Sequence, residues 1–431
     1  MRGAAAVGKK LEVVMSWVIT VFRQRRGLSR GGKHRLRPRG LAAVIAVLAL
    51  VAAACGSSST STTSSSAKPI PAGPINLGAL LTLNGPFAAI GLAQQSGLQV
   101  MVSRLNSSGG IAGHQINLIA LNDQGDPATA VSQANKLVSS NVAAVIYAGT
   151  AATNQQTIPV FMKSRVPVVM LEPEDQWANG NVYPYFFDNY PLNKPTFQFM
   201  AKFAKNQLHL GKLGIISDGT AFADSLIADL KPAASSIGLT TTGPVTYSPT
   251  AVDVTTQVRQ LQASGADGVA LLAEGGLGQV YNAFHQIGWS PPIVTTAAAY
   301  LVGYSSLGSL APTTYSNCSI SLQSGEQPPS SVTDLMQSVT SKIGVTPTDT
   351  AVPIYNDDLL IVKSAIESTH TLDPNAIKQN IESMQNRSFT WPKYAYTFSA
   401  TNHDGWPPSE IHMCKMTPLG PFDFPLVAPG G

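Results

Sequence analysis

The sequence has little of what catalysis or metal binding requires. It contains three cysteines in 431 residues, none in a C-x-x-C pair, and no H-E-x-x-H or G-x-S-x-G segment. His412 and Cys414 lie two residues apart without a further ligand cluster, so we expect no metal site. Gly276 and Gly278 form a partial G-x-G whose third position is Tyr281, so we expect no dinucleotide site. We therefore expect no cofactor and no enzymatic activity, with a secreted hydrolase as a weak alternative.

The N-terminal apolar run is too short to cross a membrane. Residues 41–51 are uninterrupted apolar sequence, whereas a membrane-spanning helix needs roughly 20 residues. Eight Lys and Arg side chains precede the run within residues 23–39, and three alanines at 52–54 follow it. A basic region, a short apolar run and small residues are typical of a secretory signal. A short membrane anchor is the alternative.

Cys55 follows the three alanines directly, and the whole arrangement resembles a bacterial lipoprotein signal. The resemblance implies that residues 1–54 are a signal peptide and that Cys55 becomes the first residue and carries diacylglycerol. Two or more acyl chains give stable anchoring where one chain is marginal. We therefore expect a lipid-anchored protein on the extracytoplasmic face of the cell membrane.

Basic charge is confined to this signal. Residues 1–54 hold eleven Lys and Arg and one acid, a net charge of +10, whereas the whole chain carries +4, so residues 55–431 carry −6. Nucleic-acid binding needs a basic surface, and we therefore expect no nucleic-acid partner.

Residues 55–74 predict a flexible tether. Ten of the twelve residues 56–67 are Ser or Thr, and a Pro-rich stretch follows them. Such a segment cannot bury enough apolar surface to fold.

An exported location also permits a disulfide between Cys318 and Cys414, and two separate buried thiols are the alternative.

Two runs of alternating strand and helix patterns follow the tether. The predicted strands are 75–81, 116–123, 143–149 and 166–172 in the first run, and 213–218, 243–247, 267–273 and 292–297 in the second. Strands that alternate with helices build parallel sheets with right-handed crossovers. We therefore expect an α/β protein with two doubly wound parallel-sheet lobes and a ligand site between them, outside the carboxyl ends of the strands.

The stretch LNSSGGIAGHQINLIALNDQGDPATAVSQANKLV, residues 105–138, resembles the leucine/isoleucine/valine-binding family of substrate-binding proteins. The matching positions are Gly109, Gly110, Ile111, Gly113, Asp123, Asp126, Pro127 and Lys136. From the residues themselves, Asp126 is a helix N-cap and Asp123 a turn former. The resemblance implies a type I periplasmic binding protein fold with a three-crossing hinge. Lobe 1 would comprise 75–190 and 324–395, and lobe 2 would comprise 191–323 and 396–431.

Candidate ligand-binding residues follow the predicted strands. Asn84, Phe87 and Thr150–Thr153 stand where helices begin, and free backbone N–H groups there favour an anion. The resemblance places Ala151 and Ala152 at the hydroxyl-rich pair that grips a ligand carboxylate, so Thr150 or Thr153 would have to substitute. An ordinary strand-to-helix turn is the alternative.

Further candidates end other predicted strands. Glu172 and Glu174 end a first-lobe strand where the family has small or hydroxyl residues, and Glu274 and Tyr300 end second-lobe strands. Phe222 corresponds to the family's tyrosine and would form an apolar wall. A desolvated carboxylate at 172 or 174 would need an amine, amide or amidine on the solute; rim glutamates in water are the alternative.

These residues predict a monomeric receptor that delivers a small amino-acid-, amide- or aromatic-acid-like solute to the permease and ATPase of an ABC importer. A ligand sensor of the same fold, coupled to a membrane signalling partner, is the alternative.

Overall fold

The structure is a computed structural model that describes residues 69–85, 88–301, 312–344 and 351–431. These residues fall within one compact unit that begins at Ser65. The predicted signal and Cys55 lie outside the described residues, as does the tether up to residue 68. In the part of the chain that is described, no helix is both long and apolar enough to cross a membrane.

A five-stranded sheet forms the core of the first lobe. Its strands are β1 (Ile75–Leu81), β2 (Ile116–Asn122), β3 (Ala144–Ala148), β4 (Val168–Met170) and β5 (Phe186–Asp188). They are all parallel, in the order β2-β1-β3-β4-β5. β1 is buried almost throughout, as its mainly apolar sequence, interrupted by Asn76, predicts for a strand covered on both faces. The short strand β5 was not predicted from the sequence.

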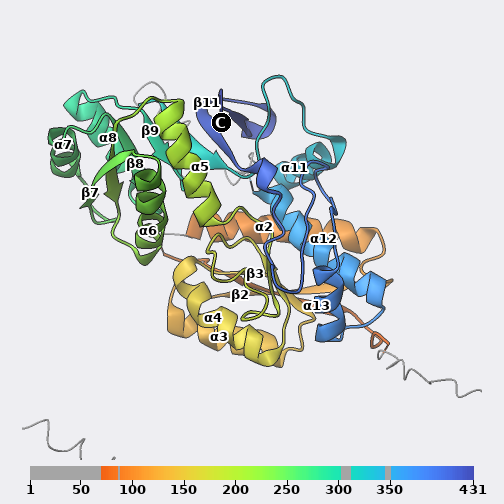
Figure 1. Ribbon diagram of the computed structural model, residues 1–431. Helices are drawn as coiled ribbons and strands as arrows, with labels where there is room; N and C mark the ends of the chain where they lie inside the picture. Colours follow the sequence, from red (N-terminus) through yellow and green to blue (C-terminus); the bar gives the residue numbers. More distant parts are fainter. Residues whose placement is uncertain (1–68, 86–87, 302–311, 345–350) are drawn as a thin grey trace, which may run out of the picture. The chain divides into compact units, whose positions relative to one another are not determined.

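Helices cover both faces of this sheet. The first three are α2 (Ala88–Ser107), α3 (Pro127–Ser139) and α4 (Ala151–Ser164). Asp126 caps α3 by accepting a 2.7 Å hydrogen bond from the Thr129 backbone N–H, so its predicted role is confirmed. Later in the chain, α11 (Ser330–Ile343), α12 (Val352–Thr369) and α13 (Pro374–Glu382) return to the first lobe, where they share its hydrophobic core (Figure 1).

A seven-stranded sheet forms the core of the second lobe. Its strands are β6 (Lys212–Ser217), β7 (Thr240–Thr246), β8 (Gly268–Leu272), β9 (Ile293–Thr295), β10 (Thr314–Cys318), β11 (His412–Leu419) and β12 (Pro425–Val427). The parallel strands run in the order β7-β6-β8-β9-β10, which repeats the first sheet's topology. β11 extends the sheet antiparallel to β10 and β12. Both doubly wound sheets were predicted, and the fold class is confirmed.

The helices of the second lobe follow the predicted alternation. They are α5 (Asn193–Asn206), α6 (Ala221–Ser236), α7 (Thr255–Ala263) and α8 (Leu277–Ile287), with the short α9 (Ala298–Leu301) after β9. α5 and α6 pack beside each other on one face, and α7 and α8 contact each other (Figure 1). The apolar faces of these helices contribute to two hydrophobic core clusters of the second lobe.

The chain passes between the two sheets three times: between β5 and α5, between β10 and α11, and before β11. Residues 396–406 belong with the first lobe, so the expected boundary at 396 is wrong. His403 donates its backbone N–H to Ala178 O at 2.8 Å, and the rings of Phe187 and Phe398 lie 5.7 Å apart. Burial of aromatic rings holds this segment on the first lobe as far as Trp406, which is 3% exposed.

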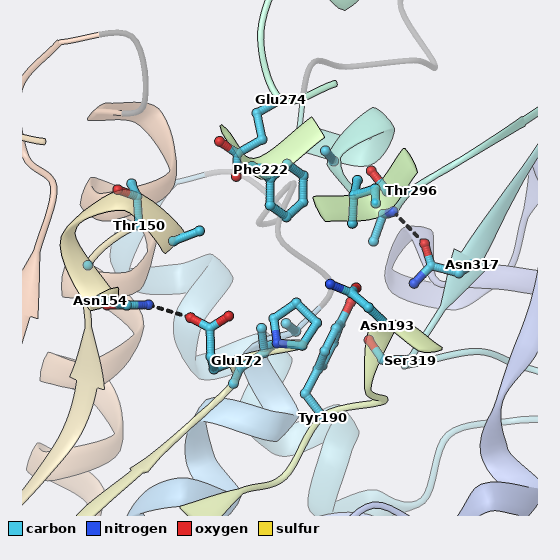
Figure 2. A pocket seen from close by; sticks show the side chains of 18 of the residues that line it. Thr150, Asn154, Glu172, Tyr190, Asn193, Phe222, Glu274, Thr296, Asn317 and Ser319 are labelled. Carbon is cyan, nitrogen blue, oxygen red and sulfur yellow. Dashed lines mark hydrogen bonds between the residues drawn. The ribbon is translucent and has the colours of Figure 1, made fainter. Parts of the chain in front are cut away.

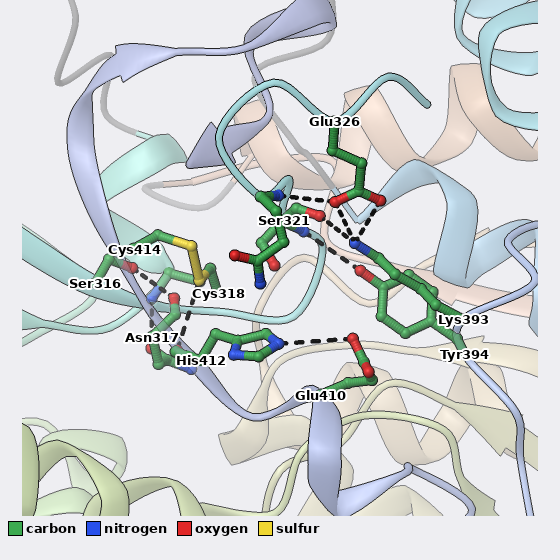
Figure 3. Close-up of a disulfide and its surroundings, with 12 residues drawn as sticks. Ser316, Asn317, Cys318, Ser321, Glu326, Lys393, Tyr394, Glu410, His412 and Cys414 are labelled. Carbon is green, nitrogen blue, oxygen red and sulfur yellow. Dashed lines mark hydrogen bonds and ion pairs between the residues drawn. A yellow bond between two sulfur atoms is a disulfide. The ribbon is translucent and has the colours of Figure 1, made fainter. Parts of the chain in front are cut away.

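A disulfide joins Cys318 at the end of β10 to Cys414 in β11, across neighbouring antiparallel strands (Figure 3). Of the two alternatives that the sequence left open, the structure has the bonded one. The crossing after β10 is also tied to the segment that leaves α13. Lys393 forms a 3.2 Å ion pair with Glu326, and the Ser321 backbone N–H donates to the Tyr394 hydroxyl at 3.3 Å. These contacts hold the crossing after β10 against the part of the first lobe that follows α13.

Candidate functional site

A pocket of about 200 Å³ lies at the carboxyl ends of strands from both sheets. In the first lobe it is lined just after β1, β3 and β4, by Thr82, Gly149, Thr150, Leu171 and Glu172. In the second lobe it is lined after β8 and β9 and around the end of β10, by Glu274, Thr296, Ala297, Asn317 and Ser319. Ligands of doubly wound sheets bind in this position, outside the carboxyl ends of the strands where the strand order reverses. The pocket therefore lies where the predicted fold requires it.

The first turn of α4 forms one side of the pocket. Thr150 is the N-cap, and its backbone N–H donates to Thr153 Oγ1 at 2.8 Å. Thr153 in turn donates to the buried Asp123 at 3.1 Å, and Asp123 also accepts from Thr82 Oγ1 at 2.7 Å. Asp123 thus ties β1, its own turn and α4 together, as its predicted structural role requires. Thr153 is occupied in capping the helix and does not line the pocket.

Glu172 places a buried carboxyl group in the pocket. Its side chain is 3% exposed, and Oε2 accepts a 2.6 Å hydrogen bond from Asn154 Nδ2 (Figure 2). Its backbone N–H donates to Asp188 Oδ1 at 3.0 Å, which fixes the turn after β4. Burial raises the pKa of Glu172 to about 8, and the neighbouring charge of Glu174 adds to the rise. An empty pocket therefore disfavours the ionised form of this carboxyl group.

Glu274 brings a second carboxyl group from the other lobe. It is half-buried after β8, and its backbone N–H donates to Asp218 Oδ2 at 2.9 Å. Burial raises its pKa to about 7, with a further contribution from the charge of Asp218. Figure 2 shows Glu274 and Glu172 on opposite sides of the drawn space, with Phe222 next to Glu274.

The remaining walls are aromatic, apolar or neutral polar. Phe222 from α6 and the buried Phe197 from α5 contribute rings from the second lobe. Tyr190, after β5, and Tyr355, from α12, contribute rings from the first. No Lys, Arg or His side chain is among the described residues that line the pocket. The described residues also contain no group of three or more His, Cys, Asp or Glu that is placed to hold a metal ion.

Five of the predicted site residues line this pocket: Thr150, Ala151, Glu172, Phe222 and Glu274. Four do not: Asn84, Ala152, Thr153 and Glu174. Asn84 is exposed and accepts a hydrogen bond from Asn122, and Ala152 is exposed on α4. Glu174 accepts from Gln176 Nε2 at 2.7 Å. Phe87 and the side chain of Tyr300 lie outside the described residues.

The sequence analysis missed other lining residues, among them Asn154, Asn193, Asn317 and Ser319. Asn317 and Ser319 flank Cys318 where β10 ends, so a strand prediction for 314–318 would have identified this position. Asn193 begins α5 directly after the first crossing between the lobes. Asn154 lies one turn into α4, and only its contact with Glu172 distinguishes it from other helical polar residues.

These features agree with the comparisons with known proteins. The chain belongs to the periplasmic binding protein family, whose model matches residues 74–412, and the predicted family is confirmed. Leu/Ile/Val-binding protein homolog 3 of Brucella melitensis is 29% identical over 213 residues, which cover 47% of this chain and 56% of that relative. The match therefore spans little more than half of the relative's length.

Solved structures share the fold. An extracellular ligand-binding receptor from Rhodopseudomonas palustris has a TM-score of 0.70 at 17% identity, covering 82% of this chain and 99% of that one. A branched-chain amino acid transporter substrate-binding protein from Streptococcus pneumoniae, in complex with isoleucine, has a TM-score of 0.68 at 18% identity, covering 80% and 96%.

Proposed function

We propose that this protein is an extracytoplasmic receptor that captures a small solute and delivers it to the permease and ATPase of an ABC importer. The observation that carries the proposal is the pocket itself, which is lined from the carboxyl ends of two sheets of matching topology. Nothing in this arrangement calls for a chemical step, so we infer binding and release of the solute unchanged.

Binding is coupled to movement of the two lobes. Both lobes contribute lining residues, so a solute that contacts Glu172 and Glu274 together is held best when the lobes are close. The three crossings between the sheets are the segments that would bend, as in hinge closure around ligands. Closure would change the surface of the receptor, so that a permease could distinguish the loaded receptor from the empty one.

The pocket volume limits the solute to a small molecule. At about 200 Å³ the pocket lies below the roughly 300–1,000 Å³ of sites for drug-sized ligands. Its rings and neutral polar groups suit a compact amphipathic solute, within the amino-acid-, amide- or aromatic-acid-like range expected from the sequence.

Cys55 would keep this receptor at the membrane through its lipid. A Cys55→Ala variant should remain unprocessed or be released from membranes, because the acylated cysteine is both the processing site and the anchor. Membrane fractionation and the mass of the N-terminal peptide test this proposal. A processed Cys55→Ala protein that still sediments with membranes would contradict it.

Two neighbouring alanines test the pocket. Ala151 lines the pocket and Ala152, next to it on α4, is exposed and does not. In a thermal-shift screen of amino acids, amides, amines and organic acids, solutes that stabilise the wild type should not stabilise Ala151→Trp, because the indole would fill the cavity. Ala152→Trp should respond as the wild type does. Equal responses of the two variants would contradict binding at this pocket.

A further inference from the structure

The charged groups that line the pocket are all of one sign. Glu172 enters from the first lobe and Glu274 from the second, and no Lys, Arg or His is among the described lining residues. The two carboxyl groups lie near enough for the charge of Glu274 to act on Glu172. A solute that enters this pocket therefore meets acidic groups from both lobes and no fixed cation among the lining residues that are described.

Glu172 lacks the donors that a buried carboxylate needs. At its Oε2 the donor is Asn154 Nδ2, and at Oε1 the Glu174 backbone N–H is 3.4 Å away, a long contact. An ionised carboxylate in a desolvated site is costly unless a cation or several hydrogen bonds compensate it. The carboxyl groups of Asp188 and Glu174 also lie near Glu172, and like charges there would raise the cost of ionising it. Without a solute the carboxyl group is held in its neutral form, and a cationic solute would supply the charge compensation that its ionised form lacks.

The first turn of α4 does not favour a solute carboxylate in this protein. A helix N-terminus attracts an anion through its free N–H groups. Here the hydrogen bond from Asn154 holds the Glu172 carboxyl group beside that first turn, so the protein supplies its own acidic group there. A second carboxylate at the same place would face Glu172 without a positive side chain to offset the repulsion.

The rest of the lining suits N–H donors and positive charge. Asn154 is 2% exposed, and its Oδ1 is buried without a hydrogen-bond partner among the described residues, so this lining residue has an unused acceptor. Phe222 and Phe197 add aromatic rings, whose faces attract cations. A quaternary ammonium group would use the rings but leave these oxygen acceptors without donors.

We propose that the solute is a small organic cation with N–H donors and no carboxylate, such as a primary amine, amidine or guanidine, bound between Glu172 and Glu274. The inference rests on the proposed receptor function and narrows its solute class. It separates this protein from a receptor for zwitterionic amino acids, which would have to accommodate a carboxylate in the same pocket.

Matched solutes test the charge requirement directly. Leucine, 3-methylbutylamine and 4-methylpentanoate share a hydrocarbon skeleton but carry both charges, only the positive one, or only the negative one. Phenylalanine, 2-phenylethylamine and 3-phenylpropanoate form a second such series on a ring. Calorimetric titration of the full mature chain at pH 8 should give the tightest binding for the amine of at least one series, by about tenfold or more over its amino acid. The carboxylates should not bind measurably.

Glutamine variants locate the charge that matters. Glu172→Gln and Glu274→Gln should each weaken amine binding by about 30-fold, which corresponds to the roughly 2 kcal/mol lost when one partner of a buried charge pair is removed. Glu367→Gln is the matched control, because Glu367 pairs with Lys363 on α12 and does not line the pocket. The control should bind amines as the wild type does.

Other results would overturn the inference. Tighter binding of an amino acid or a carboxylate than of its amine would show that the pocket accepts an anion, and binding of neither amine would show that a cation of this size is not the ligand. In these cases the proposed receptor function still stands if Ala151→Trp abolishes the response to whichever solute does bind. If no solute is found whose binding is lost in Ala151→Trp, the proposed receptor function itself fails.

Discussion

Asn154 Nδ2 donates a 2.6 Å hydrogen bond to Glu172 Oε2, which joins the first turn of α4 to the end of β4 inside the pocket. Both side chains are almost fully buried, at 2% and 3% exposed. The bond holds an acidic group at the position where a helix N-terminus would otherwise attract a solute anion. It therefore connects the architecture of the first lobe to the kind of solute that the pocket can hold.

We predict that the two glutamates after β4 differ in importance, although the sequence presents them as equivalent candidates. Glu172→Gln should weaken binding of the solute by about 2 kcal/mol, because it removes a buried charge that faces the solute. Glu174→Gln should have a much smaller effect, because Glu174 bonds to Gln176 and does not line the pocket. Titration of both variants with the same solute measures the difference. Unchanged affinity in both would exclude this part of the pocket from solute binding.

The empty protein should lose stability as the pH rises from 6.5 to 8.5. Burial raises the pKa of Glu172 to about 8 and that of Glu274, Asp357 and Asp404 to about 7, whereas in the unfolded chain such groups titrate near roughly 4. In this interval the folded state still holds protons that the unfolded state has lost, so the free energy of unfolding falls with pH. His403, whose pKa burial lowers, acts in the opposite direction at the lower end of this interval and below it, because a histidine in the unfolded chain titrates near about 6.5.

Urea unfolding at several pH values measures this slope. Glu172→Gln should flatten it, because a glutamine does not titrate, and a cationic solute should reverse part of it by stabilising the ionised carboxyl groups. A free energy of unfolding that rises steadily from pH 6.5 to 8.5 would contradict the burial of these groups.

Loss of the disulfide should destabilise the second lobe and its crossings. Cys318 and Cys414 are 96 residues apart in the chain and both nearly inaccessible. A native disulfide of this kind typically contributes about 2–4 kcal/mol to stability. The double variant Cys318→Ser/Cys414→Ser should therefore unfold at lower urea concentration, and dithiothreitol should shift the wild type but not the variant. Equal unfolding of the wild type with and without reductant would show that the bond does not form.

Asp123 should matter more for stability than Asp126, although both belong to the same sequence motif. Asp123 is fully buried and accepts hydrogen bonds from Thr82, Thr153 and the Gly125 backbone N–H. Asp123→Ala leaves these donors without their acceptor, which should cost roughly 1–3 kcal/mol or more. Asp126 caps α3 at the surface, so Asp126→Ala should cost less. Thermal unfolding of the two variants tests the order, and the reverse order would contradict the role given to Asp123.

The sequence predicted the two doubly wound lobes because alternation of buried strands and amphipathic helices is a local signal. β1 begins and ends at its predicted residues, for example. The short strand β5 carries no such signal, because its three residues are defined by pairing with β4. The boundary before β11 was also misplaced, since only tertiary contacts show that Phe398 and Trp406 pack on the first lobe.

The pocket was predicted in part, for a related reason. Residues that directly follow strands, such as Thr150, Glu172 and Glu274, could be found from the position of the strand ends. Glu174 lies two residues after Glu172, and the sequence alone could not show which of the two side chains enters the pocket, because that depends on the turn after β4. Tyr355 comes from α12, which reaches the pocket only because the chain returns to the first lobe. No local sequence pattern predicts that return.

Small-angle X-ray scattering of the mature protein, with and without a solute that stabilises it, tests most directly whether two lobes close over a bound molecule. At a free concentration of about 100 times Kd the solute should add about 2.7 kcal/mol of stability. Under the same conditions the radius of gyration should decrease, and the Ala151→Trp variant should show neither effect. Stabilisation of the wild type without any decrease in the radius of gyration would contradict closure of the lobes around the pocket.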